Sequence, residues 1–134
     1  MSLNNFSTAN NIVTVNGRQI QDWGQADPAI TEAQIDDKSA LIRGQGGNAT
    51  RLDRINPGRT VTLALQPGSA DATYLQGLFE SNANITYTRQ VIGTLETSFG
   101  DQGVCTSDGQ TGRAGQTITD NIFTFQFNQF VSAK

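Results

Sequence analysis

Asp and Glu side chains are the main candidates for chemistry in this chain, because the sequence contains no histidine and a single cysteine, Cys105. Without imidazole there is no Ser-His-Asp or Cys-His arrangement, no histidine-bound zinc and no imidazole acid–base catalysis. Carboxylate pairs remain at Asp36-Asp37 and at Asp101 with Asp108. Adjacent strand residues point to opposite faces, and a glycosidase pair needs a cleft. An enzyme is therefore the least favoured class.

Two glycine-bearing stretches have some features of ligand-binding loops. The stretch DQGVCTSDGQ, residues 101–110, contains calcium-type ligands but lacks EF-hand spacing. The stretch RGQGGNATR, residues 43–51, lacks the Gly-Lys-Ser/Thr of a phosphate loop, and no helix is expected to begin there. We interpret the first as a solvated turn and the second as a flexible hairpin tip, and we expect no metal and no cofactor.

Length and charge limit the possible functions further. The chain has 134 residues, about the size of one domain, and we expect a single domain over 1–134. Its net charge of -3 argues against a nucleic-acid binder of the basic-patch type. The beginning of the chain does not read as a signal peptide, and no apolar run reaches the ~18 residues of a membrane span. We therefore expect no membrane insertion.

The elements that must position these side chains are mostly strands. The dipeptide Asn16-Gly17 predicts a tight hairpin within residues 11–21, because both central residues of a type I′ turn need positive φ. Alternating or β-rich patterns predict further strands at 29–38, 39–42, 59–65, 85–92, 96–105 and 121–130. The 96–105 strand is the weakest, since Gly100 and Gly103 interrupt it. Cys105 is expected to be a small, half-buried strand residue.

One helix is predicted at residues 69–82. Ser69 is placed to cap it, and Asp71 lies in the first turn, where the helix dipole favours negative charge. Leu75, Leu78 and Phe79 recur at helical spacing and form an apolar stripe for packing. The predicted fold is therefore mainly β, an antiparallel β-sandwich or partial barrel of about six to eight strands with one flanking α-helix.

Charge is segregated along the chain. The glycine- and arginine-rich loop or hairpin at 43–59 has four basic residues against one acidic residue, Asp53, whereas the segment 22–37 is acidic and has no basic residue. Such segregation favours electrostatic complementarity between copies. Trp23 lies near the start of a loop and is expected in the core or at an interface.

The order of these elements resembles the tail tube proteins of contractile-tailed bacteriophages, which are related to tailocin and type VI secretion tube proteins. The resemblance rests on DDK from Asp36, on Gly46-Gly47-Asn48, on DRINPGRTVTLAL and on PGSADATYLQGLFES. The early hairpin and the stretch from Gly103 to Phe130 fit as well, so that the resemblance covers 13–130. The chain departs from the family at the helix start, which lacks Ser-Pro, and in the final strand, which has phenylalanine where tryptophan is common.

The resemblance implies a structural virion protein rather than an enzyme. Such subunits assemble into stacked hexameric rings that form the inner tail tube, the conduit for genome ejection. The implied partners are other copies of the chain, a surrounding tail sheath, a baseplate hub and a tail terminator at the ends, and a tape measure protein and then DNA in the lumen without sequence-specific binding. The implied location is the virion tail, after assembly in the host cytoplasm.

The resemblance gives two sets of residues a possible role in the assembled tube. Inter-ring or subunit contact is expected from Arg43, Gly46, Gly47, Asn48, Arg51, Arg54 and Arg59. Candidates for the lumen face are Glu32, Gln34 and Asp36, which alternate along the 29–38 strand opposite a face of small, mostly apolar residues. The alternatives left open are the tube of a tailocin or secretion apparatus, and a monomeric β-sandwich module that binds a glycan or a protein.

Overall fold

The computed structural model describes residue 3 and residues 10–134, and within these residues it contains nine strands and one helix. The strands are β1 (Asn11–Val15), β2 (Arg18–Ile20), β3 (Ile30–Gln34), β4 (Ser39–Arg43), β5 (Ala49–Asp53), β6 (Arg59–Leu65), β7 (Ile85–Val91), β8 (Thr97–Ser107) and β9 (Asn121–Ala133), and the helix is α1 (Ala70–Glu80). The chain is thus mainly β with one helix, as the sequence predicts.

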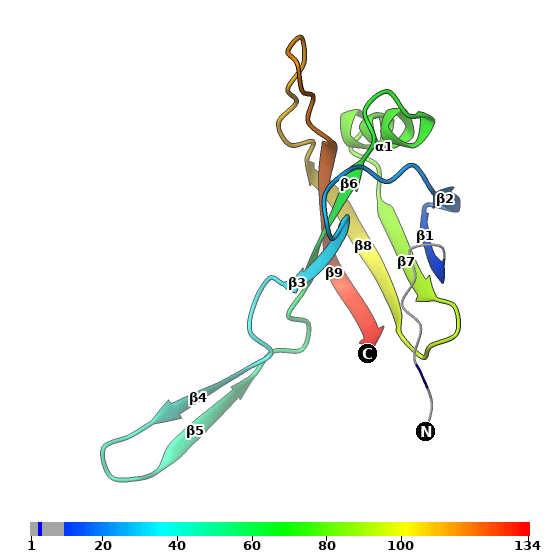
Figure 1. Cartoon of the computed structure of the whole chain (residues 1–134). Coiled ribbons are helices and arrows are strands. Elements are labelled where there is room, and N and C mark those ends of the chain that lie inside the picture. Colours follow the sequence, from blue (N-terminus) through cyan, green and yellow to red (C-terminus); the bar gives the residue numbers. More distant parts are fainter. Residues whose placement is uncertain (1–2, 4–9) are drawn as a thin grey trace.

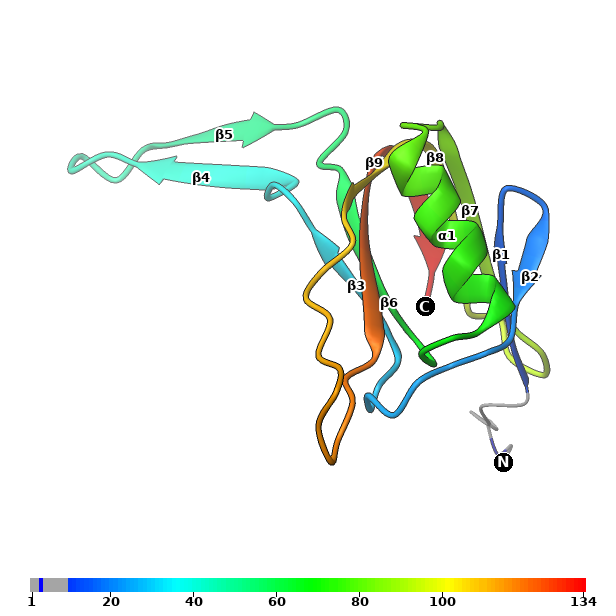
Figure 2. The same cartoon turned by 90° about the horizontal axis from the view of Figure 1, so that it is seen from above.

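Seven of the strands form one antiparallel sheet in the order β2-β1-β7-β8-β9-β6-β3. The sheet curves strongly, so that the edge strand β3 lies opposite β7 rather than in a plane with it (Figures 1 and 2). This curvature makes a partial barrel, open between β3 and the β1–β2 edge. The remaining strands, β4 and β5, form a separate two-stranded hairpin.

The concave side of the sheet holds the core. Phe123, Phe125 and Phe127 alternate along β9 and are 2%, 0% and 1% exposed, as their spacing predicts. Burying each ring removes apolar area that contributes about 1.5–3 kcal/mol per large apolar side chain. Val61 and Leu63 from β6 and Tyr87 from β7 are fully buried against them.

Strand β8 runs for 11 residues despite its two glycines, with an irregularity in its pairing with each neighbouring strand. Gly100 and Gly103 both pair with β9, opposite Phe130 and Phe127. A side chain at Gly103 would collide with the Phe127 ring, and one at Gly100 would lie 3.0 Å from the Phe127 and Phe130 rings, closer than an ordinary contact. The glycines therefore make room for aromatic rings in the core and do not break the strand. Cys105, further along β8, is 6% exposed and thus more buried than expected.

The hairpin at Asn16-Gly17 forms as predicted. Asn16 and Gly17 adopt φ angles of 51° and 84°, and Val15 pairs with Arg18 on either side of the turn. The Asn16 side chain also accepts a hydrogen bond of 2.7 Å from the Thr86 backbone N–H, which fixes the turn to the start of β7.

Helix α1 lies across one end of the curved sheet (Figure 2). Ser69 is its N-cap and accepts a hydrogen bond of 3.2 Å from the Ala72 N–H. Leu75 is fully buried, and Leu78 and Phe79 are half-buried and pack against the core. The helix therefore closes the end of the partial barrel with the apolar stripe read from the sequence.

Candidate functional site

The β4–β5 hairpin projects away from the rest of the molecule (Figures 1 and 2). Every residue from 33 to 56 is exposed. The two strands pair from Ser39 with Asp53 to Arg43 with Ala49, and the tip turn closes through a 2.8 Å hydrogen bond from the Gly44 N–H to the Asn48 carbonyl. A two-stranded ribbon is marginally stable alone, and no residue of this ribbon is buried against the described part of the chain.

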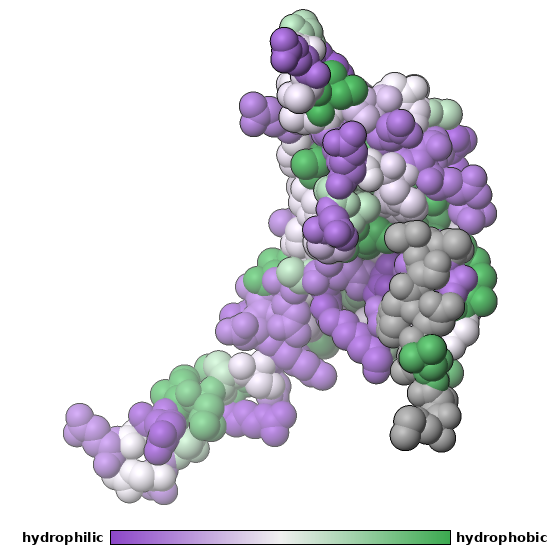
Figure 3. All heavy atoms as spheres, viewed as in Figure 1, coloured by the Kyte–Doolittle hydropathy of each residue, from purple (hydrophilic) through white to green (hydrophobic). Residues whose placement is uncertain are grey.

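The hairpin has one apolar face. By the strand alternation and the register, Ile42 and Leu52 share a face with Ala40 and Thr50, and Lys38 and Arg54 continue that face toward the root. Ile42 is 55% exposed and Leu52 is 52% exposed. Figure 3 shows apolar atoms gathered on the hairpin between hydrophilic groups. An exposed apolar face of this kind is a candidate interaction surface.

The opposite face is organised by charge around Leu41. Asp53 accepts hydrogen bonds of 2.7 Å from the Ser39 hydroxyl and 2.8 Å from Arg51 Nε. These hydrogen bonds, that from Ser39 first, hold the pKa of the Asp53 carboxyl below its usual value. Both contacts meet at Asp53, near the root of the ribbon, and exposed ion pairs contribute little stability.

The structure separates the residues predicted to make inter-ring contact. Gly46, Gly47 and Asn48 lie in the exposed tip turn, where Gly47 adopts a φ of 89°, and Arg43, Arg51 and Arg54 lie along the exposed ribbon. Arg59 does not belong to this surface. It begins β6, is half-buried, and places its guanidinium 5.0 Å from the centre of the Phe130 ring. The loop expected at 43–59 is a hairpin that begins at Ser39.

The residues predicted for the lumen face differ in exposure. Gln34 and Asp36 are exposed, but the Glu32 side chain is only 7% exposed and points into the concave side. Its carboxylate accepts hydrogen bonds from the Tyr87 hydroxyl at 2.7 Å and from Arg89 at 2.9 and 3.2 Å. Glu32 therefore faces the interior of this chain and not an aqueous channel.

Arg89 is the centre of this buried ionic cluster. Besides Glu32, it binds Glu96 at 2.9 Å and donates a 3.2 Å hydrogen bond to the Ser98 hydroxyl, while Ser98 donates to Glu32 at 3.0 Å. Burial opposes the charge on Arg89, yet its hydrogen bonds to Glu32 and Glu96 raise its pKa. Burial would raise the pKa of Glu32, but hydrogen bonds from Arg89, Tyr87 and Ser98 lower it overall. Both groups are thus charged at neutral pH.

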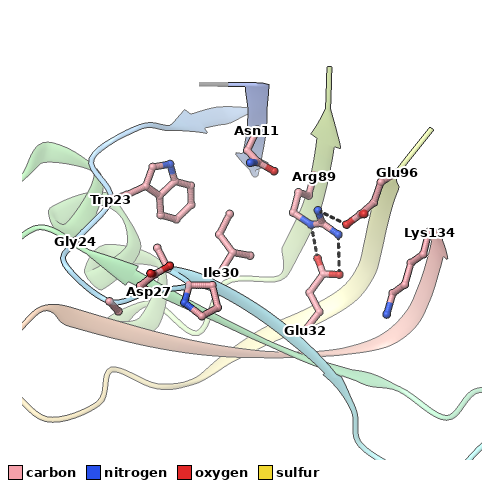
Figure 4. Close-up of a pocket in the computed structure, with 12 residues that line it drawn as sticks. Asn11, Trp23, Gly24, Asp27, Ile30, Glu32, Arg89, Glu96 and Lys134 are labelled. Carbon is pink, nitrogen blue, oxygen red and sulfur yellow. Dashed lines mark hydrogen bonds and ion pairs between the residues drawn. The ribbon is translucent and has the colours of Figure 1, made fainter. Parts of the chain in front are cut away.

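A cleft lies beside this cluster, on the open side of the sheet. It has a volume of about 670 Å³ and is lined by Asn11, Trp23, Gly24, Ala26, Asp27, Pro28, Ala29, Ile30, Glu32, Arg89, Glu96 and Lys134. Figure 4 shows Trp23 and Ile30 on one side of the cleft and the ionic cluster on the other. Trp23, which the sequence placed in the core or at an interface, packs partly against the core and partly lines this cleft.

Comparisons with known proteins address the fold. Neither a scan against protein-family models nor a search of curated proteins finds a match. Among solved structures, a chain from the cryo-EM structure of the sheath/tube terminator of the PVC extracellular contractile injection system, in the extended state, matches with 15% identity, a TM-score of 0.68 and 100% coverage of both chains.

Two further structures agree with the first. The tube terminating cap of the anti-feeding prophage matches with 15% identity and a TM-score of 0.65, over 99% of this chain and 93% of that chain. The PVC sheath-tube complex in the extended state matches with 15% identity and a TM-score of 0.63, over 96% and 91%. The chain shares the fold of contractile injection system proteins.

Asp71 has a structural role that the sequence did not predict, because it joins α1 to the segment after β2. Its carboxylate is buried and accepts hydrogen bonds from Arg18 Nε at 2.9 Å and from the backbone N–H groups of Gln21 and Asp22 at 2.8 and 3.1 Å. Burial would raise its pKa, but these hydrogen bonds lower it overall. Asp71 thus fastens the chain after β2 to α1, immediately before Trp23.

The residues that the structure describes show no sign of two other kinds of site. No group of three or more Asp, Glu, Cys or His side chains among residue 3 and residues 10–134 could hold a metal ion. The helix that the structure describes is too short and too polar to span a membrane. The exposed hairpin and the cleft are two surface features of the described residues that are open to a partner.

Proposed function

We propose that this chain is a tube subunit of a contractile tail or injection machine, and that it acts by self-assembly into stacked hexameric rings. The observation that carries the proposal is the β4–β5 hairpin. It is exposed along its whole length and has an apolar face formed around Ile42 and Leu52. A projecting ribbon of this kind is stabilised when it packs on a neighbouring copy.

The shared fold supports this proposal. The alignment with a chain of the PVC sheath/tube terminator structure covers both chains completely, so the similarity extends over the entire subunit. Chains from a tube terminating cap and from a sheath-tube complex match over 91% or more of their own length. The role that fits these neighbours is a structural component of a tube, with no enzymatic activity.

The charge of the chain suits a conduit for nucleic acid. With a net charge of -3, the assembled wall would repel DNA, whereas a basic wall would bind phosphates and slow their passage. Gln34 and Asp36, which are exposed at the end of β3 and just beyond it, remain the candidates for the lumen face. The Glu32 carboxylate is buried, so Glu32 is not proposed for the lumen face.

The remaining parts of the proposal concern the assembled machine. The tube would be surrounded by a sheath and would end at a baseplate hub and a terminator, with a tape measure protein and then DNA in its lumen. We place it in the tail of a bacteriophage virion assembled in the host cytoplasm. A tailocin or a type VI-like secretion tube would use the same subunit surfaces, and the genes beside this one would distinguish these systems.

Electron microscopy of the purified chain tests the proposal directly. Concentrated protein should form tubes with a central hole. The matched control replaces residues 35–58 by an Asn-Gly turn, since Gln34 and Arg59 are paired neighbours on β3 and β6. This shortened chain should fold but remain monomeric. A full-length chain that stays a monodisperse monomer at all concentrations and salt conditions would contradict the proposal.

A second candidate function is a monomeric module that binds a glycan or a protein. One observation favours it, the position of the half-buried Trp23 in a cleft of about 670 Å³. Quenching of Trp23 fluorescence by glycans at micromolar concentrations would support this candidate, because the chain has one tryptophan. An unchanged emission spectrum across a glycan panel would exclude glycans as its ligand.

A further inference from the structure

The hairpin and the main body of the chain carry opposite charge. Residues 35–58, which lie outside the main sheet, contain four basic and three acidic residues, a net charge of +1, and the rest of the chain contains five basic and nine acidic residues, a net charge of -4. The two values sum to the net charge of -3 of the whole chain. These opposite net charges favour contact between the hairpin of one copy and the body of another.

The cleft on the open side of the sheet has the chemistry to receive the apolar face of the hairpin. Trp23, Pro28 and Ile30 supply apolar surface, and the exposed Asp27 lies among them, whereas the exposed Lys134 lines the cleft on the side of the ionic cluster. The hairpin face also combines apolar surface with charge, but its charge is basic. Ile42 and Leu52 are apolar, and Arg54 lies near the root of the hairpin.

The cleft wall is held in place before any partner arrives. The Gly24 N–H donates to the Ala64 carbonyl at 3.0 Å, and the Ala26 N–H donates to the Asp120 carboxylate at 2.9 Å. Asp71 holds Gln21 and Asp22, so the chain on both sides of Trp23 is fixed. A rigid receiving wall lowers the ordering cost of binding an exposed ribbon.

We infer that the cleft formed by Trp23, Asp27, Pro28 and Ile30 is the docking site for the β4–β5 hairpin of a neighbouring copy. The inference rests on the proposed function and names the partner surface of the hairpin. Donor and acceptor are different surfaces of one chain, so the contact is heterologous and each copy both gives and receives a hairpin. Contacts of this kind build rings when the rotation closes and filaments when it does not.

Site-specific photocrosslinking tests the docking site. Leu52→p-benzoylphenylalanine places a photoreactive group on the apolar face of the hairpin. Assemblies made from a mixture of isotope-labelled and unlabelled chains are irradiated, and mass spectrometry identifies crosslinks between copies. We expect crosslinks to residues 23–32. The matched control, Leu41→p-benzoylphenylalanine, sits on the opposite face of the same ribbon and should not give them.

Each outcome decides between the two proposals. Crosslinks that concentrate elsewhere, for example at the exposed pair Phe99 and Val131 on the convex face, overturn the inference, and tubes in the same sample leave the proposed function intact. Tubes without crosslinks from position 52 also overturn it. Crosslinks to 23–32 without tubes support docking and contradict the tube, and a sample with neither contradicts both.

A charge reversal provides an independent measurement. Asp27→Lys places a basic group beside the basic hairpin, and Glu80→Lys makes the same charge change at an exposed position on α1 away from the cleft. We expect the first substitution to raise the concentration needed for assembly by about tenfold relative to the second, which corresponds to about 1.4 kcal/mol. Equal effects of the two substitutions would show that only total charge matters and would overturn the inference.

Discussion

Glu32 on β3 and Arg89 on β7 form a buried ion pair across the open side of the curved sheet, with contacts of 2.9 and 3.2 Å. Their side chains are 7% and 10% exposed. The two strands are not neighbours in the sheet, so this pair joins edge strand to interior strand without backbone hydrogen bonds between them. It also fixes the strand from which the projecting hairpin departs.

Arg89→Ala should destabilise the folded chain strongly. The substitution leaves the Glu32 carboxylate buried without its cation, and breaking a buried ion pair in this way costs about 3–5 kcal/mol. Urea unfolding of the monomeric, hairpin-shortened chain measures the change. Gln116→Ala in the same shortened chain, an exposed position, is the control and should change stability by less than about 0.5 kcal/mol. A loss below about 1 kcal/mol for Arg89→Ala would contradict the role given to the pair.

Stability should fall in acid because the pKa values of Glu32 and Asp71 are lowered on folding. A carboxylate with a lowered folded pKa stabilises the protein above its unfolded pKa, and that contribution is lost as pH falls through the folded pKa. The free energy of unfolding should therefore begin to fall below about pH 4–5, near the ordinary carboxyl pKa values. Urea titrations between pH 2 and pH 7 measure it. Glu32→Gln should give a shallower pH dependence, and an unchanged slope would exclude Glu32 as a contributor.

Gly103→Ala should destabilise the core, because the new methyl group would collide with the Phe127 ring. Overpacking of this kind costs typically about 1–3 kcal/mol. Gly77→Ala is the matched control, since Gly77 lies in α1 with open space around it, and should stabilise the chain by up to about 1 kcal/mol. Thermal unfolding should separate the two alanine variants in opposite directions. Similar melting temperatures would show that Phe127 can move aside.

Ile42→Ser combined with Leu52→Ser should abolish assembly without affecting folding. Both side chains are more than half exposed, so their loss changes little within one chain. Sedimentation velocity measures assembly and circular dichroism measures folding. Leu41→Ser, on the opposite face of the ribbon, is the control and should assemble nearly as well as the parent chain. Normal tubes from the double variant would remove the apolar face from the assembly contact.

Local rules predicted much of the fold. The Asn16-Gly17 turn, the Ser69 cap and the alternating phenylalanines of β9 each depend on neighbours in sequence, and each appears as expected. The strand that contains Gly100 and Gly103 was expected to be interrupted by its glycines. They instead leave space for the ring of Phe127, which is distant in sequence. A tight turn can be predicted from its own two residues, whereas a close contact between strands depends on residues far apart in the sequence.

The candidate site was less predictable. Alternation separated the two faces of β3, but it did not say which face points inward, and the apolar Ile30 on the same face as Glu32 was the available signal. The partners of Glu32 lie on β7 and β8, and no local pattern pairs them with β3. The sequence similarly assigned Arg59 to the basic loop, but in the structure its guanidinium lies over the ring of Phe130.

The chain leaves the sheet after Gln34 and returns at Arg59, and these two residues face each other as partners on adjacent antiparallel strands. The excursion between them contributes no residue to the core. Its length and sequence are thus free to change while the body folds as before. Mutation can redesign how copies recognise one another, or lengthen the reach of each subunit, without risking the domain that carries it.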